Sequence, residues 1–534
     1  MKVSKIFLPA LAFALAIAPC GFAQGRRGGG GGDEFEQAQG RRGGGGAQQN
    51  AGQQTAQGAG ATTPRLPPPE DNVSVTHHTA SIGGQQITYT ATAGTWVLKA
   101  DDGSALASVF FVAYTKDGVE DISKRPIAFS YNGGPGSASL FVHMGFGPRT
   151  VKLTPDGHGM PAPYSIEDNQ DSFLDATDLV FVDAISTGYS RPAPGENANQ
   201  FHGLNEDAQA FANFIRLYIT RTSRWDSPKY LIGESYGTTR SAALSGALEQ
   251  RYEIYLNGIV LVSAVLNFQT LQPAPGNDLP YIAYFPTYAT TAWFHHLLSP
   301  DMQKLTVEQI AQESREFADG EYATALMKGD SLTAAETTHV VDQIAKFTGL
   351  SKEYIRETNL RINSRRWFKE LERNKRRTIG RLDSRFEGID VDAAGEGPEY
   401  DASEASYEGA FVATFEDYVR RELGYRSDAE MFVTGPVQPW DYPQNRYADV
   451  SDTLRGAMTR QTYLKVLVVA GYYDVACVMH GVEYTVDHMN LDPSIRKNIT
   501  FTYYESGHMV YVDQKAHDKL HKDVDNFINS SYPH

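Results

Sequence analysis

The stretch YLIGESYGTTRSAA, residues 230–243, decides the fold. Its first apolar residues predict a strand, a GESYG turn centred on Ser235 follows, and the small residues after the turn predict a helix. This is the G-x-S-x-G nucleophile elbow in the strand-turn-helix context that it requires. The glycines leave room for nearby backbone, and the start of the helix points N–H groups at developing negative charge. Taken alone, the pattern also fits an ordinary glycine turn.

Strands and helices alternate on both sides of this elbow. Strands are predicted at residues 126–131, 179–182, 258–264, 465–470 and 498–504, and helices at 205–222 and 515–528. Such alternation is typical of a mostly parallel sheet with helices on both faces. Residues 87–93, 96–99 and 107–114 are β-rich and separated by glycine turns, which indicates antiparallel hairpins at the sheet edge.

A glycine-rich loop, NGGPGS at residues 132–137, leaves the end of the strand at 126–131. Loops at the carboxyl ends of strands line the ligand crevice of an open α/β sheet. In a hydrolase such a loop supplies a second N–H to the oxyanion, because glycine lets the backbone approach the substrate. A plain turn is the alternative interpretation.

Two further residues follow late strands. Asp474 comes just after the strand at 465–470, and His508 comes after the strand at 498–504. Singly, Asp474 could cap a helix, and His508 is one of 14 histidines. The chain order Ser235, Asp474, His508 is nevertheless that of an α/β-hydrolase triad. The sequence therefore predicts an α/β fold of the α/β-hydrolase class, with a mostly parallel central sheet flanked by helices.

Regularity lapses at about residues 268–450, where aromatic and then polar helical stretches predict a helical cap inserted into a single catalytic domain, residues 72–534. The basic run at 361–381 could bind nucleic acid, but acidic residues intersperse it and favour a solvated helix face. The acidic stretch at 387–401 is expected to be an exposed loop. A net charge of −16 over 534 residues also argues against nucleic-acid binding.

Residues 1–23 predict a signal peptide, because lysines precede a short apolar run and small residues follow it. We therefore expect export to the periplasm or the medium. Cys20 would allow a lipid anchor, but Pro19 before it is a poor fit to the small residue that such processing prefers. Cleavage leaves only Cys477, so no intramolecular disulfide can form. No stretch of the chain approaches the ~20 apolar residues of a membrane-spanning helix.

Residues 24–71 are rich in Gly, Arg, Gln and Pro and predict a disordered linker, since they lack the apolar surface that would offset the entropy of ordering. The Arg-Gly runs could instead contact RNA or an anionic envelope surface. For an exported chain with few basic residues in this segment, a tether is the preferred interpretation.

Four motifs together resemble the serine carboxypeptidase family, peptidase family S10, in its bacterial form. They are NGGPG at 132–136, GESYG at 233–237, GYYD at 471–474 and GHM at 507–509. Asp183 with the GYS of residues 188–190 resembles a further motif of the family. The resemblance extends from residue 73 to the C-terminus.

The resemblance implies a role for each matching residue. Ser235 would be the nucleophile, His508 the base and Asp474 its orienting partner. The backbone N–H groups of Gly134 and Tyr236 would form the oxyanion hole. Asn132 and Glu234 would hold the C-terminal carboxylate of the substrate.

The chain departs from the family pattern in two places. Ser137 stands where many relatives have a disulfide cysteine. Family members often have a second glutamate shortly after the glycine loop, but residues 141–148, FVHMGFGP, contain none. His143 lies in this stretch, where it could contact substrate or serve a structural role.

The expected function is therefore that of an exported serine carboxypeptidase acting on peptides with a free C-terminal carboxylate, without cofactor or metal. An esterase or acyltransferase on the same scaffold is the first alternative, since a triad does not choose between amide and ester chemistry. A non-catalytic binding protein with this fold is the second alternative, which the complete set of motifs opposes.

Overall fold

The computed structural model describes residues 67–532. The predicted signal peptide and residues 24–66 of the predicted linker lie outside the described residues. Within residues 67–532, no helix combines the length and the hydrophobicity needed to cross a bilayer.

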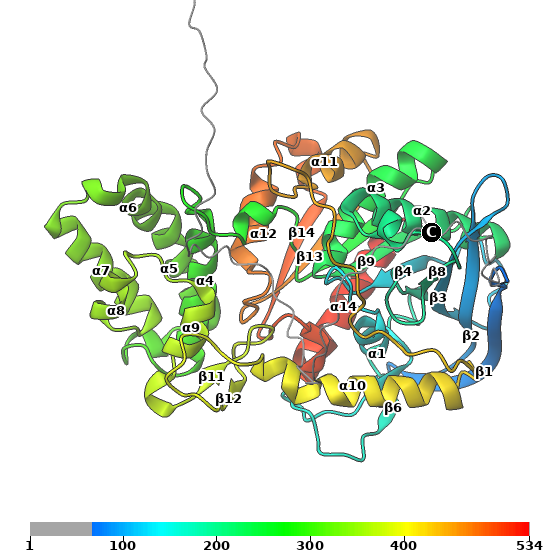
Figure 1. Ribbon diagram of the computed structural model, residues 1–534, viewed down its shortest axis with the longest axis horizontal. Helices are drawn as coiled ribbons and strands as arrows, with labels where there is room; N and C mark the ends of the chain where they lie inside the picture. The colour runs from blue at the N-terminus through cyan, green and yellow to red at the C-terminus, as the bar shows by residue number, and fades with distance from the viewer. Residues whose placement is uncertain (1–66, 533–534) are drawn as a thin grey trace, which may run out of the picture. The chain divides into compact units, whose positions relative to one another are not determined.

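A ten-stranded mixed sheet forms the centre of this part of the chain, in the order β1-β2-β3-β7-β4-β9-β10-β13-β14, with β8 beside β3 (Figure 1). The strands are β1 (Asn72–Ile82), β2 (Gln85–Lys99), β3 (Ala105–Lys116), β4 (Ile127–Tyr131), β7 (Asp178–Val182), β8 (Arg191–Pro192), β9 (Lys229–Glu234), β10 (Gly258–Val262), β13 (Lys465–Gly471) and β14 (Ile499–Tyr504). From β7 to β14 all neighbours are parallel, whereas β1, β2, β3 and β7 pair antiparallel. The predicted α/β-hydrolase fold, with its mostly parallel sheet, is confirmed.

The antiparallel edge differs in detail from the sequence prediction. Residues 87–93 and 96–99 belong to one long strand, β2, rather than to two strands joined by a turn. Gly94 is the reason, because a Cβ there would lie 2.1 Å from the carbonyl oxygen of Asn72. The glycine lets β1 approach β2 closely, and the strand continues through it.

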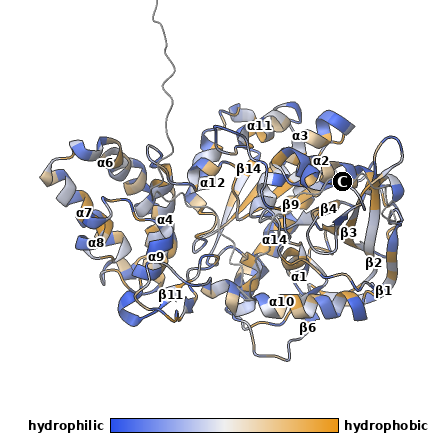
Figure 2. Ribbon diagram, in the orientation of Figure 1, coloured by the Kyte–Doolittle hydropathy of each residue, from blue (hydrophilic) through white to orange (hydrophobic). Residues whose placement is uncertain are grey.

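Helices cover both faces of the sheet. On one face lie α2 (Leu204–Arg221), α3 (Tyr236–Tyr252) and α11 (Ser451–Arg460), and on the other lie α1 (Leu140–Phe146), α10 (Ala402–Arg421) and α14 (Gln514–Ser530). Successive strand residues point to opposite faces, so Phe129 of β4 packs in one hydrophobic core and Ala128 in the other. The central strands β4, β9 and β10 are buried throughout and are largely hydrophobic (Figure 2). Burial of both sheet faces explains their apolar runs.

Residues 268–450, the expected cap, contain two kinds of helix. The first kind comprises six α-helices: α4 (Leu279–Phe294), α5 (Val307–Phe317), α6 (Ala323–Lys328), α7 (Ala334–Thr348), α8 (Lys352–Glu357) and α9 (Ser364–Glu370). These six gather in one group, whereas α10 runs along the core (Figure 1). Phe411 and Phe415 of α10 pack in the same core as Leu140 of α1. The segment therefore supplies a helical lobe and also a part of the main core.

The remaining elements are short. They are the pair β5 (Arg149–Val151) and β6 (Ile166–Asp168), the pair β11 (Thr378–Ile379) and β12 (Glu387–Gly388), and the helices α12 (Met479–Asp487) and α13 (Pro493–Arg496).

The charged run at 361–381 is not the solvated helix that its pattern predicts. Only α9 is α-helical there, and Lys369 within it is buried in an ion pair with Asp390. Asp390 itself comes from the stretch at 387–401 that was expected to be exposed. Both predictions are wrong at these positions, because a buried charge is tolerated when an opposite charge accompanies it.

Candidate active site

Ser235 lies in the sharp turn between β9 and α3. Its backbone has φ 61° and ψ −130°, in a region that non-glycine residues rarely occupy. A Cβ on Gly233 would lie 2.2 Å from the carbonyl oxygen of Gly237, and a Cβ on Gly237 would lie 2.8 Å from that of Tyr131. The turn therefore needs glycine on both sides of Ser235, as the motif predicts.

His508 and Asp474 form a buried pair. Nδ1 of His508 lies 2.9 Å from Oδ2 of Asp474. The other carboxylate oxygen, Oδ1, accepts the backbone N–H groups of Ala476 at 2.8 Å and Cys477 at 2.9 Å. Burial alone would lower the pKa of His508, but the Asp474 carboxylate raises it well above its usual value. An Nδ1–H bonded to Asp474 leaves Nε2 free to accept a proton.

The end of β10 contacts the loops of both Ser235 and His508. The N–H of Ser235 donates to the carbonyl oxygen of Val262 at 3.0 Å, and Oγ of Ser263 donates to that of His508 at 2.6 Å. Since β9, β10, β13 and β14 are parallel neighbours, their carboxyl ends lie at one edge of the sheet. The structure thus brings Ser235, Asp474 and His508 to the same edge. Among residues 67–532, the Ser235 hydroxyl has no hydrogen-bonding partner.

The glycine-rich loop after β4 rests on the start of α3. A Cβ on Gly133 would lie 2.4 Å from the backbone nitrogen of Tyr236, so only glycine permits this approach. The next residue, Gly134, has φ 103°, which also favours glycine. Tyr236 is the first residue of α3, and N–H groups at a helix start have no partner within the helix. The loop and the helix start can therefore present amides to one developing negative charge.

Asn132 and Glu234 form a hydrogen-bonded pair next to Ser235. Nδ2 of Asn132 donates to Oε1 of Glu234 at 2.7 Å, and Oδ1 of Asn132 accepts the N–H of Val142 at 3.0 Å. Burial raises the pKa of Glu234 to about 7, although nearby His508 opposes the shift. A buried carboxyl group with this pKa carries a proton below neutral pH and can then donate a hydrogen bond.

Arg240, which sequence reasoning missed, supports the glycine-rich loop from behind. It is buried in α3, where its Nε lies 2.6 Å from Oδ2 of Asp207 and its Nη1 donates to the carbonyl oxygen of Asn132 at 2.6 Å. Burial raises the pKa of Asp207, and Arg240 opposes that rise. No local pattern marks Arg240, because its partners lie far away in the sequence.

A segment of the 268–450 region, residues 382–384, forms hydrogen bonds with the loop that carries His508. The N–H of His508 donates to the carbonyl oxygen of Leu382 at 2.7 Å, and the N–H of Gly507 donates to Oδ2 of Asp383 at 3.1 Å. A Cβ on Gly507 would lie 2.4 Å from the carbonyl oxygen of Leu382. The glycine before His508 was the only sequence signal of this contact.

Two other residues named in the sequence analysis, His143 and Asp183, make contacts that stabilise the fold. Nε2 of His143 lies 2.6 Å from the Tyr114 hydroxyl, and burial lowers the pKa of His143 to about 3. This favours the structural role over substrate contact. The Asp183 carboxylate accepts the N–H of Ser139 at 2.7 Å and lies so close to Gly188 that a Cβ there would be 1.6 Å from it. Asp183 therefore holds the start of α1 and a glycine turn together.

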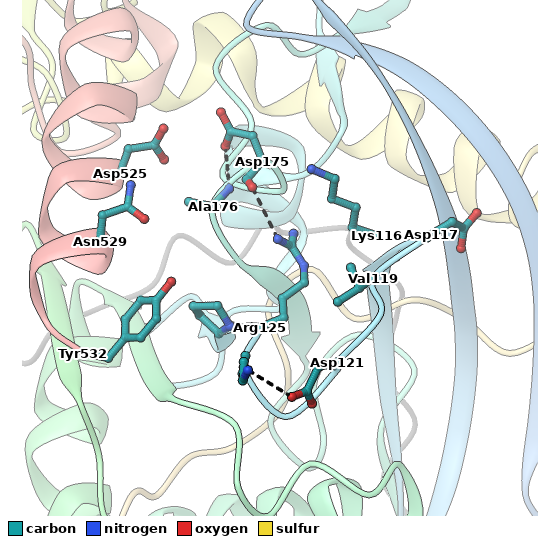
Figure 3. A pocket seen from close by; sticks show the side chains of 13 residues that line it. Lys116, Asp117, Val119, Asp121, Arg125, Asp175, Ala176, Asp525, Asn529 and Tyr532 are labelled. Carbon is teal, nitrogen blue, oxygen red and sulfur yellow. Dashed lines mark hydrogen bonds and ion pairs between the residues drawn. The ribbon is translucent and has the colours of Figure 1, made fainter. Parts of the chain in front are cut away.

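Two cavities have linings that include none of Ser235, Asp474 and His508. One, of about 540 Å³, lies at the amino end of β4, opposite the edge that carries Asn132, and Lys116, Arg125, Asp175 and Asp525 project from its walls (Figure 3). The other, of about 760 Å³, is lined by residues of β5 and β6 and by Tyr511.

Comparisons with known proteins support one family. The family model described as serine carboxypeptidase matches residues 97–521. A search of curated protein sequences finds no match. Among solved structures, a thermostable carboxyl esterase from Bacillus coagulans, in complex with glycerol, is 11% identical with a TM-score of 0.35, covering 82% of this chain and 98% of its own. The peroxisomal alpha-beta-hydrolase Lpx1 from Saccharomyces cerevisiae is 10% identical with a TM-score of 0.33, covering 87% and 91%.

Proposed function

Because the chain belongs to the serine carboxypeptidase family, a family of serine-type hydrolases that act on peptides, we propose that it removes C-terminal residues from peptides through an acyl-enzyme on Ser235. The observation that carries this proposal is the Asn132–Glu234 pair, which lies beside a strained serine and gives the site a means of recognising a carboxylate. A general esterase has no need of such a pair.

The proposed reaction uses each group in turn. Oγ of Ser235 attacks the scissile carbonyl carbon while Nε2 of His508 takes the hydroxyl proton. Asp474 holds the imidazole and stabilises its positive charge, and the N–H groups of Gly134 and Tyr236 bind the oxyanion. His508 then gives the proton to the departing amine, which leaves as the C-terminal amino acid. Water activated by His508 hydrolyses the acyl-enzyme and restores Ser235.

The proposed specificity depends on the proton of Glu234. An ionised Glu234 would repel the carboxylate of the substrate, whereas the protonated form donates a hydrogen bond to it. With a pKa raised to about 7, Glu234 is mostly protonated in acid and ionises as the pH rises through neutrality. The amide of Asn132 donates at any pH. Binding of free-carboxylate peptides is therefore expected to weaken above neutral pH.

Replacing Glu234 with glutamine tests this assignment. For the wild type we expect KM for a free-carboxylate peptide to rise as the pH passes about 7, whereas kcat follows the deprotonation of His508. Glu234→Gln keeps a donor of similar shape that does not ionise, so its KM should be flat over the same range. Steady-state kinetics across pH measure both. The control is the same peptide with a blocked C-terminus, whose KM should not follow this titration in either protein. A pH-dependent KM that survives in Glu234→Gln would contradict the role of Glu234.

We also propose that the enzyme is exported and is of the bacterial form of the family. The lysines, apolar run and small residues of 1–23 support export. When the full chain is expressed in a Gram-negative host, the protein recovered from the periplasm or medium should begin at Gln24, as measured by N-terminal sequencing. A chain without residues 2–23 should stay in the cytoplasm. Cytoplasmic protein that retains Lys2 in the full-length expression would rule out this signal peptide.

A further inference from the structure

Two buried polar atoms beside the carboxylate site have no hydrogen-bonding partner among residues 67–532. They are Oε2 of Glu234 and the hydroxyl oxygen of Tyr511. The Tyr511 hydroxyl lies close enough to interact with the side chains of both Glu234 and Asn132, yet it has hydrogen-bond geometry with neither. Buried polar groups in folded proteins are nearly always paired, so two unpaired neighbours indicate a place for a third group.

The ring of Tyr511 is held by close packing. Tyr511 lies in the short 3₁₀ turn Val510–Val512, three residues after His508. A Cβ on Gly145 would lie 2.5 Å from the Tyr511 ring, so glycine at position 145 makes the space that the ring fills. Phe146 packs edge-to-face against the same ring, with centroids 5.0 Å apart. The ring is therefore held by packing, and its hydroxyl lies near Asn132 and Glu234.

Family members often have a second glutamate in the stretch that corresponds to residues 141–148, but this chain has no carboxyl group there. The stretch has Gly145 instead, and the ring of Tyr511, from a distant part of the chain, packs against this glycine. Burial, and next the neighbouring Glu234, raise the pKa of the Tyr511 hydroxyl well above its usual value. The hydroxyl therefore keeps its proton at any pH at which the enzyme is folded and works, and it remains a hydrogen-bond donor.

We propose that Tyr511 is a substrate-binding residue that donates a hydrogen bond to the C-terminal carboxylate of the peptide. This assignment rests on the proposed carboxypeptidase function. In this assignment the substrate carboxylate lies within hydrogen-bonding distance of the Tyr511 hydroxyl, Glu234 and Asn132, and it accepts from all three. Among these three donors, the Tyr511 hydroxyl keeps its proton when Glu234 ionises. It also donates to no other group of the described protein. The preference for a free carboxylate should therefore depend on its hydroxyl.

The test is Tyr511→Phe, which removes the hydroxyl and keeps the ring over Gly145. We expect KM for a free-carboxylate peptide to rise about ten-fold or more, since a hydrogen bond to a charged group is lost. KM for the same peptide as a C-terminal amide should change by less than about three-fold, and kcat by less than about two-fold, since the amide is neutral and the triad is untouched. The melting temperature should hold or increase, because the lost hydroxyl has no protein partner.

Tyr504→Phe is the matched control. Tyr504 is also a buried tyrosine and lies shortly before Tyr511 in the sequence. Its hydroxyl, unlike that of Tyr511, donates to Asp523 at 2.6 Å. Its substitution should leave KM for both substrates unchanged. Gly145→Ala is a second variant, whose added Cβ displaces the Tyr511 ring and should reproduce the selective rise in KM.

The outcomes separate this inference from the proposed function. If the wild type prefers the free acid and Tyr511→Phe keeps its KM, the carboxypeptidase function stands and the role of Tyr511 is wrong. If the only effect of Tyr511→Phe is to shift the pH-dependent rise in KM to a higher pH, Tyr511 changes the pKa of Glu234 and does not bind substrate. If the wild type cleaves acid and amide equally, both proposals fail.

Discussion

Ser235→Ala should lower kcat/KM by at least about 10⁴-fold, the largest loss expected of any single substitution. The alanine has no oxygen to form the acyl-enzyme, and the remaining groups only bind and polarise the substrate. The strained turn and both glycines stay in place, so the folded state should be preserved. Turnover of a small peptide by purified wild type and variant measures the loss.

A fluorophosphonate should label Ser235 alone in the wild type, and Ser235→Ala should not be labelled. Ser245→Ala is the matched control, because Ser245 is a buried serine of α3, the helix after Ser235, and its hydroxyl donates to the carbonyl oxygen of Ala242 at 2.7 Å. This variant should be labelled and active like the wild type. Labelling at another serine, or turnover by Ser235→Ala close to that of the wild type, would remove Ser235 as the nucleophile.

Asp474→Asn should lower kcat by about 10⁴-fold. The N–H groups of Ala476 and Cys477 hold Oδ1 as an acceptor, so the amide NH₂ of asparagine takes the position of Oδ2 opposite Nδ1 of His508. An NH₂ group donates to Nδ1, which moves the imidazole proton to Nε2. His508 then lacks the free Nε2 that accepts the serine proton.

Loss of the Asp474 charge should also lower the pKa of His508, because that carboxylate raises it against the effect of burial. NMR of the imidazole nitrogens measures both the tautomer and the pKa, and kcat is measured on the same samples. Asp492→Asn, at an exposed Asp that caps α13, should behave like the wild type. An Asp474→Asn enzyme that keeps kcat within ten-fold would show that Asp474 does not set the tautomer.

Much of the core and the position of the proposed catalytic residues follow from local sequence patterns. Apolar runs that end in glycine turns predict β4 and β13 to within about one residue, since both strands are buried on both faces. Parallel neighbours carry their loops at the same edge, so Ser235, Asp474 and His508 are expected together from their positions after strands alone. The structure places them at that edge.

The groups that orient these residues were not predictable, because each acts across a long sequence separation. Arg240 reaches Asn132, Leu382 and Asp383 hold the His508 loop, and Tyr511 fills the space over Gly145. A charge pattern likewise gives no sign that Lys369 is buried, because its partner Asp390 becomes a neighbour only in the folded chain. Such contacts depend on tertiary packing and leave no local periodicity.

The most direct test of the account uses the wild-type enzyme and one peptide, offered as the free acid and as the C-terminal amide, with products followed by mass spectrometry. The account predicts stepwise release of single residues from the C-terminus of the free acid, with the amide largely spared. The preference for the free acid over the amide should fall as the pH passes the Glu234 pKa of about 7, because the titration of His508 affects both substrates alike. Equal cleavage of acid and amide at every pH, or cleavage within the peptide, would contradict a carboxypeptidase that recognises its substrate by the terminal carboxylate.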